Sequence, residues 1–153
     1  MSGLDHKVPP PIVGALVALA MWLVASAEPS SIVGPALRHA ITGALVAAGV
    51  AFDLLGLVAF RASRTTVNPL RPERASALVT GGVYRITRNP MYVGLALLLV
   101  AWAVHLGSAL PFVGPIAFVA YITRFQILPE ERVLAQRFGA AFDAYRGRVR
   151  RWL

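Results

Sequence analysis

The sequence predicts an all-α integral membrane protein with about four transmembrane helices, a cytoplasmic loop and a C-terminal amphipathic helix. Of its 153 residues, 57% are hydrophobic and 14% are charged, and a soluble domain of this size could not hide so many apolar side chains in one core. Four apolar segments come close to the roughly 20 residues that a helix needs to cross a ~30 Å hydrocarbon layer. Arginines gather in the segments that would share one side of the membrane.

The four predicted spans cover residues 8–27, 40–60, 91–108 and 109–128. Three prolines open the first segment, and proline suits the first turn of a helix, where a missing amide proton does no harm. A signal peptide is the alternative for this segment, but no small-residue cleavage site followed by a soluble domain appears. A glycine, a serine and a proline are the only breaks around the junction of the third and fourth segments, which predicts a tight helical hairpin.

The second span is apolar except for Thr42 and Asp53. Charge is costly inside a membrane and is often functional there. Asp53 is therefore a candidate for a direct catalytic role, with helix packing or pairing with an arginine as the simpler explanation. Glycines at 43, 49 and 56 predict a close contact between this helix and another.

Basic residues predict how the chain crosses the membrane. The segment between the second and third spans contains Arg61, Arg64, Arg71, Arg74, Arg85 and Arg88. The tail after the fourth span contains Arg132, Arg137, Arg146, Arg148, Arg150 and Arg151. The opposite loops carry Arg38 alone. By the positive-inside rule, both termini and the segment between the second and third spans face the cytoplasm, from the inner or plasma membrane of the cell.

The tail is predicted to form one amphipathic helix over residues 129–145, because apolar residues recur there at intervals of three and four with charges between them. These apolar residues are Val133, Leu134, Phe138, Ala141, Phe142 and Tyr145. The helix would lie on the membrane surface or pack beneath the spans. No repeat or second domain is evident, and residues 1–153 are expected to form a single membrane-embedded domain.

Composition excludes several kinds of site. The chain has no cysteine, which rules out disulfides, thiolate metal sites and thiol nucleophiles. Its three histidines lie far apart in sequence, so we expect no metal site. The formal net charge of +8 could suggest nucleic acid, but arginines that flank apolar runs are typical of the cytoplasmic side of a membrane protein. Membrane lipids are therefore the expected partners, and nucleic acid is not.

A turn and a helix start lie on the predicted cytoplasmic side. Gly81 and Gly82 permit a tight turn, after which Asn89 and Pro90 begin the third span with a side-chain cap and a proline in the first turn. A turn followed by a capped helix explains these residues. The exposed amides of such a helix start can also hold a carboxylate or a phosphate.

Two adjacent carboxylates, Glu130 and Glu131, follow the fourth span. Acidic residues in the first turn of the tail helix would complement its dipole. At a membrane interface among arginines, the same carboxylates are also placed to grip a cationic ligand. Spacing alone does not decide between these two interpretations.

Several motifs, in order along the chain, resemble those of a known family. They are Leu-Val-Thr-Gly-Gly-Val-Tyr at 78–84, Arg-Asn-Pro-Met-Tyr-Val-Gly at 88–94, Glu-Glu-Arg-Val-Leu at 130–134, Arg-Phe-Gly at 137–139 with Tyr145, and Val-Arg-Arg-Trp at 149–152. From about Thr65 to the C-terminus the chain resembles the isoprenylcysteine carboxyl methyltransferases. That family belongs with the phospholipid methyltransferases among integral membrane enzymes that use S-adenosylmethionine. The resemblance implies a methyltransferase whose cofactor-binding part covers about 65–153.

The resemblance implies a cofactor pocket built from the central loop, the start of the third span and the acidic pair. The implied cofactor-binding residues are Ser76, Ala77, Leu78, Val79, Tyr84, Asn89, Pro90, Met91, Tyr92 and Glu130. Of these, Asn89, Tyr92 and Glu130 are also the implied catalytic residues. Gly94 corresponds to a glycine that lets helices approach closely.

Two positions depart from the family pattern. The family's histidine is Asn89 here; an asparagine forms hydrogen bonds but does not titrate near neutrality, so a histidine general base is unavailable. A substrate-contacting arginine of eukaryotic members corresponds to Gln126, with Arg124 two residues earlier. These two residues are the candidates for substrate binding.

The expected function is methyl transfer to a lipophilic acceptor, either a small molecule or a lipid-modified substrate. O-methylation of a carboxylate, as in isoprenylcysteine carboxyl methylation, is the leading reaction. A carboxylate is already an anion and needs no base, which fits the loss of the histidine. One alternative is an NADPH-dependent membrane reductase, since sterol reductases are similar in their C-terminal architecture. The other is a small membrane scaffold or transporter subunit without enzymatic activity.

Overall fold

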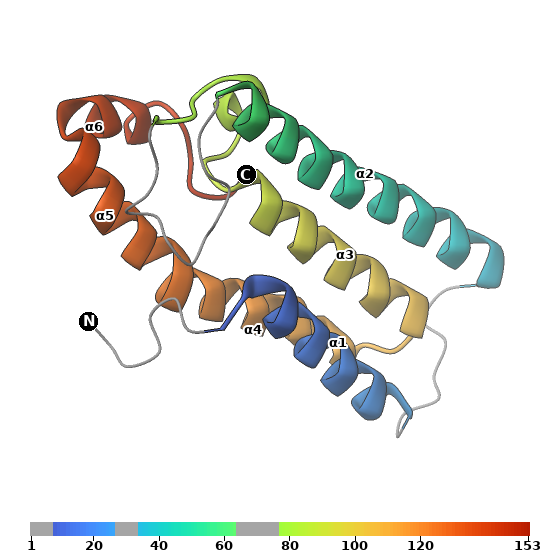
Figure 1. The fold of residues 1–153 in the computed structure, drawn as a ribbon. Coiled ribbons are helices and arrows are strands. Elements are labelled where there is room, and N and C mark those ends of the chain that lie inside the picture. The colour runs from blue at the N-terminus through green and yellow to red at the C-terminus, as the bar shows by residue number, and fades with distance from the viewer. Residues whose placement is uncertain (1–7, 27–33, 64–76) are drawn as a thin grey trace.

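A computed structural model describes residues 8–26, 34–63 and 77–153, and the secondary structure within these ranges is helical, without a strand. Four helices run side by side, and two further helices follow the last of them at one end of the bundle (Figure 1). The four are α1 (Pro10–Ser26), α2 (Pro35–Ala62), α3 (Pro90–Leu106) and α4 (Val113–Ile122). The all-α prediction is therefore confirmed for the described residues.

Within the described residues, two helical stretches are long and apolar enough to cross a membrane. They are the 28-residue α2 and a 29-residue helical stretch, Leu110–Phe138, that contains α4. Helices α1 and α3 are apolar but have 17 residues each, which is about 26 Å of helix and the lower limit for a span. Each predicted span thus corresponds to an apolar helix, and the crossing of all four stays a prediction.

The turn between α3 and α4 contains the glycine and the proline that predicted a tight hairpin at this point. Gly107 ends α3 at a φ of +76°, in the left-handed region that glycine enters without strain. Pro111 lies in a single 3₁₀ turn, Leu110–Phe112, and α4 follows directly. The buried side chains of Leu99, Phe118 and Ile122 belong to one core cluster with residues of α1.

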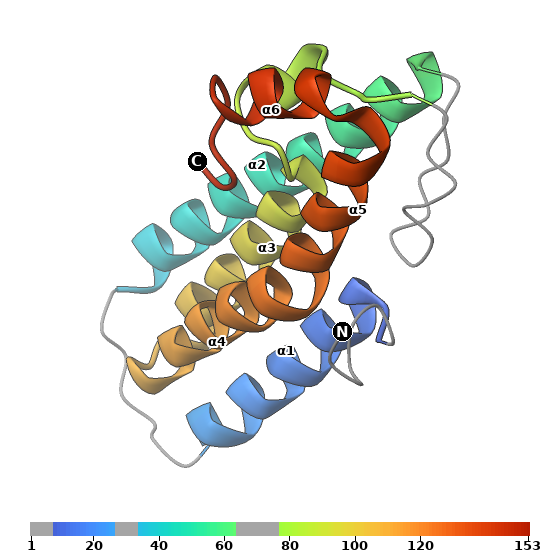
Figure 2. The same cartoon turned by 90° about the vertical axis from the view of Figure 1, so that its left-hand side faces the viewer.

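Helix α4 does not stop where the predicted fourth span ends. A π-helical turn, Thr123–Ile127, leads straight into α5, Leu128–Phe138. Pro129 explains the wider turn, because in a regular α-helix its ring would clash with the carbonyl four residues earlier and its missing N–H would leave that carbonyl unpaired. Figure 2 shows α5 continuing along the same direction as α4.

The prediction of one amphipathic helix over 129–145 is wrong in one respect. The tail forms two helices, α5 and α6 (Ala140–Arg146), separated at Gly139. Gly139 has a φ of +48° and a ψ of −125°, a conformation that disfavours side chains with a Cβ. The chain therefore turns there, and α6 lies across the end of the bundle (Figure 2).

Glycines let α2 and α3 approach closely, as two of the three predicted positions show. A Cβ on Gly49 would lie 3.0 Å from the carbonyl oxygen of Gly94, and a Cβ on Gly56 would lie 2.9 Å from Cγ of Met91. Gly43 has nothing within 4 Å, so the predicted contact is absent there. On α3, Gly94 completes the contact, because a Cβ on it would collide with the carboxylate of Asp53.

We expect the Gly94→Ala substitution to destabilise the protein by about 1–3 kcal/mol, the usual cost of overpacking a tight contact. Its Cβ would also lie 2.8 Å from the carbonyl oxygen of Gly49, where neither backbone can give way. Unfolding in detergent micelles, followed by circular dichroism, measures the loss. Gly43→Ala is the matched control, and it should be neutral or stabilising by about 0.5–1 kcal/mol, since alanine is the better helix former. Equal stability of the two variants would contradict the role of Gly94.

Candidate functional site

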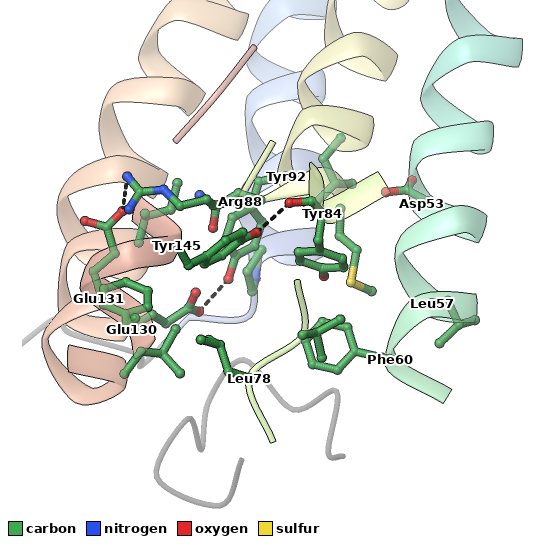
Figure 3. A pocket seen from close by; sticks show the side chains of 18 of the residues that line it. Asp53, Leu57, Phe60, Leu78, Tyr84, Arg88, Tyr92, Glu130, Glu131 and Tyr145 are labelled. Atoms are coloured by element: carbon green, nitrogen blue, oxygen red, sulfur yellow. Dashed lines mark hydrogen bonds and ion pairs between the residues drawn. The ribbon is translucent and has the colours of Figure 1, made fainter. Parts of the chain in front are cut away.

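A cavity of about 490 Å³ lies at the end of the bundle where α2 ends, α3 begins and α6 crosses. Its walls come from the starts of α1 and α3, the last turns of α2, residues 77–79, α5 and α6. Cavities of roughly 300–1,000 Å³ are the usual size of small-molecule sites. Figure 3 shows Arg88, Glu130 and Glu131 on the α5 side of the cavity, and Asp53, Leu57 and Phe60 on the α2 side.

The start of α3 is held by the C-terminal segment. The backbone N–H of Arg88 donates to the carbonyl of Arg150 at 2.9 Å, and the hydroxyl of Thr87 donates to the carbonyl of Arg151 at 3.1 Å. The amide Nδ2 of Asn89 donates to the carbonyl of Arg151 at 2.9 Å. The predicted side-chain cap by Asn89 is therefore wrong, because this side chain binds the C-terminal backbone and makes no cap hydrogen bond to α3.

Tyr92 and Glu130, which the resemblance places in one pocket, are in direct contact. The hydroxyl of Tyr92 on α3 donates to Oε1 of Glu130 on α5 at 2.6 Å (Figure 3). Both side chains line the cavity. Among the described residues Glu130 has no basic partner, so its carboxyl group is available to a cation that enters the cavity.

The neighbouring Glu131 has a different role. Its Oε1 lies 3.0 Å from Nη2 of Arg88, and its Oε2 lies 2.7 Å from Nη2 of Arg151. Arg151 also donates from Nε to Oε1 at 2.9 Å, and this hydrogen bond raises the pKa of the guanidinium above its usual value. Glu131 therefore joins α5, the C-terminal segment and the start of α3, and only Glu130 of the pair is available to a cation.

Arg88 is a charged cavity residue that was not among the predicted site residues. One of its nitrogens binds Glu131, but Nε and Nη1 are buried and have no hydrogen-bond partner among the described residues. A buried unpaired donor is costly, and a bound anion would satisfy both nitrogens. The signal for Arg88 in the sequence was its position next to Asn89. The backbone amides of this helix start can hold a carboxylate or a phosphate.

Two tyrosines close the cavity next to these charges. The hydroxyl of Tyr145 on α6 donates to the backbone carbonyl of Tyr84 at 2.7 Å. Burial raises the pKa of Tyr145 to about 12, against an opposing effect of Arg88. Burial raises the pKa of Tyr84 further, with added contributions from Tyr145 and Glu130. Both phenols therefore keep their protons near neutral pH, and Tyr145 uses its proton in this hydrogen bond.

Eight of the ten implied cofactor-binding residues line the cavity. They are Ala77, Leu78, Val79, Tyr84, Asn89, Met91, Tyr92 and Glu130. Pro90 is buried in the first turn of α3, and Ser76 lies outside the described residues.

The two candidate substrate-binding residues lie elsewhere. Gln126 is buried in the π-helical turn and donates to the carbonyl of Val8 at 2.8 Å. Arg124 is exposed, with its guanidinium over the ring of Phe125. Neither side chain lines the cavity, and their role in substrate binding stays a prediction. Among the described residues, no group of three or more histidines and carboxylates could hold a metal ion.

The fold and the cavity define a helical membrane protein with a charged small-molecule pocket at one end of its bundle. Residues 37–141, more than half of the chain, match the model of the phospholipid methyltransferase family. The chain belongs to that family and is a membrane methyltransferase. The family assignment confirms the resemblance noted in the sequence.

A curated relative adds little about activity. An uncharacterized protein of Haemophilus influenzae is 44% identical over 63 residues, which cover 41% of this chain and all of that protein. No solved structure matches the chain significantly.

Proposed function

We propose that the protein transfers a methyl group from S-adenosylmethionine to a lipophilic acceptor that reaches the pocket from the bilayer. The observation that carries this proposal is that one cavity presents an acidic group without a basic partner and two buried donors without acceptors. Glu130 offers a carboxylate without a basic partner, and Arg88 offers two buried nitrogens without hydrogen bonds. The amino-acid end of the cofactor carries an ammonium and a carboxylate, which match them.

The residues present fit this cofactor. A bidentate carboxylate on Arg88 would use its geometry as a planar donor fork, and an ammonium beside Glu130 would neutralise a charge that is costly to bury alone. Leu78, Val79 and Met91 provide apolar surface at the same cavity for the adenosine. When bound, the cofactor supplies an electrophilic methyl group on a sulfonium.

The protein's own contribution is alignment and exclusion of water. Transfer of a methyl group requires the nucleophile to approach in line with the bond that breaks, so holding both partners in one orientation lowers the barrier. Tyr84, which is buried and keeps its proton, lines the cavity and is placed to fix a polar group without removing a proton from it. Apolar side chains dominate the α2 wall, which favours the exclusion of water from this side of the cavity.

The α2 wall also provides the route for a lipophilic acceptor. Leu54, Leu57 and Phe60 line the cavity from α2, and Leu54 is 56% exposed. In a bilayer, an apolar side chain exposed on this helix faces lipid. We propose four spans with both termini and the pocket on the cytoplasmic side, as the arginines indicate.

The test is ligand-induced stabilisation of the purified protein in detergent. S-adenosylhomocysteine at 100 times its dissociation constant should stabilise the folded state by about 2.7 kcal/mol, seen as a higher melting temperature. NADPH should leave the melting temperature unchanged, since nothing in the cavity favours the reductase alternative. Stabilisation by NADPH and not by S-adenosylhomocysteine would overturn the proposed function.

A further inference from the structure

The end of the bundle opposite the cavity carries a second cluster of polar side chains. It consists of Arg38 and His39 at the start of α2 and His105 at the end of α3. Figure 1 shows these two helix ends side by side, away from α6, and the ring centroids of the two histidines lie 6.4 Å apart. About 22 Å of α2 separates Arg38 from Asp53 on the cavity wall, so the cofactor site does not use this cluster.

Arg38 is a guanidinium that lacks an acceptor. Its Nε is buried without a hydrogen-bond partner, and the ion pairs within the described ranges do not include it. One turn further along the same face of α2, the hydroxyl of Thr42 is also buried and unpaired. The dipole of α3 favours a cation beside its last turn, but this attraction supplies no acceptor for Nε. Since a buried donor without an acceptor is costly, the surroundings of Arg38 favour a ligand that brings one.

Neighbouring residues hold the cluster in place. Gly107 leaves the space that the guanidinium occupies, because a Cβ on this glycine would lie 2.7 Å from Nη1 of Arg38. The ring of His105 stacks on Trp102 with the centroids 5.4 Å apart. Nε1 of Trp102 in turn donates to the carbonyl of Ala18 in α1 at 3.0 Å. Contacts with α1 and α3 therefore fix these side chains before a ligand arrives.

The chemistry of the cluster fits a phosphate group. A guanidinium has five N–H donors and no acceptor, and an imidazole offers at least one N–H in either protonation state. The planar donor fork of an arginine binds phosphate oxygens in pairs. The acidic residues that the structure describes all lie on the cavity wall or on α6, at the other end: Asp53, Glu130, Glu131 and Asp143. An anionic headgroup is therefore favoured over a zwitterionic one, whose ammonium would find no partner among them.

The length of α2 places the cluster at the depth of lipid headgroups. Helix α2 has 28 residues, or about 42 Å of helix, and a bilayer with its headgroups is ~40–45 Å thick. Arg38 lies in the first turn of this helix. On the neighbouring face of α2, Leu37 is 59% exposed and Ile41 is 37% exposed, which provides apolar surface for an acyl chain beside the headgroup.

We propose that Arg38, His39 and His105 bind the phosphate of an anionic phospholipid in the leaflet opposite the cofactor pocket. This lipid is bound and not methylated, because the length of α2 separates it from the cavity. It ties the start of α2 to the end of α3, and the opposite ends of these two helices line the cavity. The inference uses the proposed crossing of α2 and is independent of the cofactor.

The experiment is native mass spectrometry in a non-ionic detergent, which counts bound lipids and gives a dissociation constant for each. We expect one phosphatidylglycerol to bind the wild type more tightly than any further molecule. Arg38→Gln should weaken this first binding step by about 10-fold or more, as expected for a lost charge-assisted hydrogen bond. Arg61→Gln, which removes an arginine from the last turn of the same helix, is the matched control and should keep the first step. Equal losses in the two variants would reveal general charge attraction and overturn the site.

Further probes identify what is recognised. His105→Phe keeps a ring against Trp102 and removes the N–H, so it should weaken the first step by about 5-fold, the effect of one neutral hydrogen bond. Diacylglycerol, which lacks the phosphate, and inorganic phosphate, which lacks acyl chains, should both compete poorly with phosphatidylglycerol. Competition by diacylglycerol as strong as that by the phospholipid would overturn the recognition of phosphate. Inorganic phosphate that binds as tightly as the lipid would overturn the assignment to a lipid.

Two controls keep the result separate from folding and from the proposed function. Arg38→Lys keeps the charge and lacks the donor fork, so it should bind the lipid more weakly than the wild type and more tightly than Arg38→Gln. S-adenosylhomocysteine should raise the melting temperature of Arg38→Gln as much as that of the wild type. Absence of this rise in both proteins would overturn the proposed function and leave the lipid site standing. Wild-type lipid binding by Arg38→Gln would overturn the lipid site alone.

Discussion

Replacing Glu130 with glutamine should weaken binding of S-adenosylhomocysteine by about 100-fold, or roughly 2.7 kcal/mol. Glutamine has the same shape, and its carbonyl oxygen can still accept the hydrogen bond that Tyr92 donates at 2.6 Å. The substitution removes the negative charge opposite the ligand's ammonium, and an ammonium enclosed without a counter-ion is strongly disfavoured. Titration calorimetry in detergent micelles measures the dissociation constant directly.

The matched control is Asp143→Asn, which removes an exposed carboxylate from α6. Oδ1 of Asp143 lies 3.0 Å from Nε of Arg146, and both side chains are more than half exposed. Loss of this ion pair should therefore change neither ligand binding nor stability appreciably. Methylthioadenosine, which lacks the amino-acid end of the cofactor, should bind wild type and Glu130→Gln equally. A variant that binds S-adenosylhomocysteine as tightly as the wild type would refute the role given to Glu130.

The four helices of the bundle, α1 to α4, were predictable because each contains a long apolar run, and proline or glycine bounds several of them. Pro10, Pro35 and Pro90 each begin a helix, and Gly107 ends one. The break at Gly139 was missed because the apolar periodicity continues across it, and periodicity reports the buried face of a helix without reporting its continuity. A single glycine in a helical pattern is compatible with either outcome.

The placement of Tyr92 and Glu130 in one pocket was predicted from the family resemblance. Their spacing in the sequence alone could not have predicted it. A π-helical turn adds a residue to one turn, which rotates everything that follows by about 100° relative to a regular α-helix. The turn at Thr123–Ile127 therefore helps decide which of the two adjacent glutamates contacts Tyr92. No sequence period reveals such a local change of phase.

The positions of Arg88 and Asp53 at the cavity depend on contacts between distant segments. Arg88 faces the cavity because the C-terminal segment binds the start of α3 and Glu131 takes one of its nitrogens. Asp53 faces the cavity because Gly94 brings the backbone of α3 close to it. The sequence marks both residues as charged groups near apolar segments. Only the tertiary contacts show that they face the cavity and not the surface.

Replacing Arg88 with alanine should weaken binding of S-adenosylmethionine by about 10-fold to 100-fold, the range of a lost charge-assisted hydrogen-bond pair. Its Nε and Nη1 are the buried donors that the cofactor's carboxylate would satisfy. Arg151 still binds both oxygens of Glu131 at 2.9 and 2.7 Å, so the fold should survive the substitution. Melting temperature without ligand checks this point.

Decarboxylated S-adenosylmethionine distinguishes Arg88 from Glu130, because it keeps the ammonium and lacks the carboxylate. Arg88→Ala should bind this analogue as well as the wild type does, whereas Glu130→Gln should bind it poorly. Arg85→Ala, which removes an exposed arginine just before the start of α3, is the control for a general loss of positive charge. Equal losses for the two ligands in Arg88→Ala would mean that Arg88 acts by holding Glu131 and the helix start, and not by contacting the carboxylate.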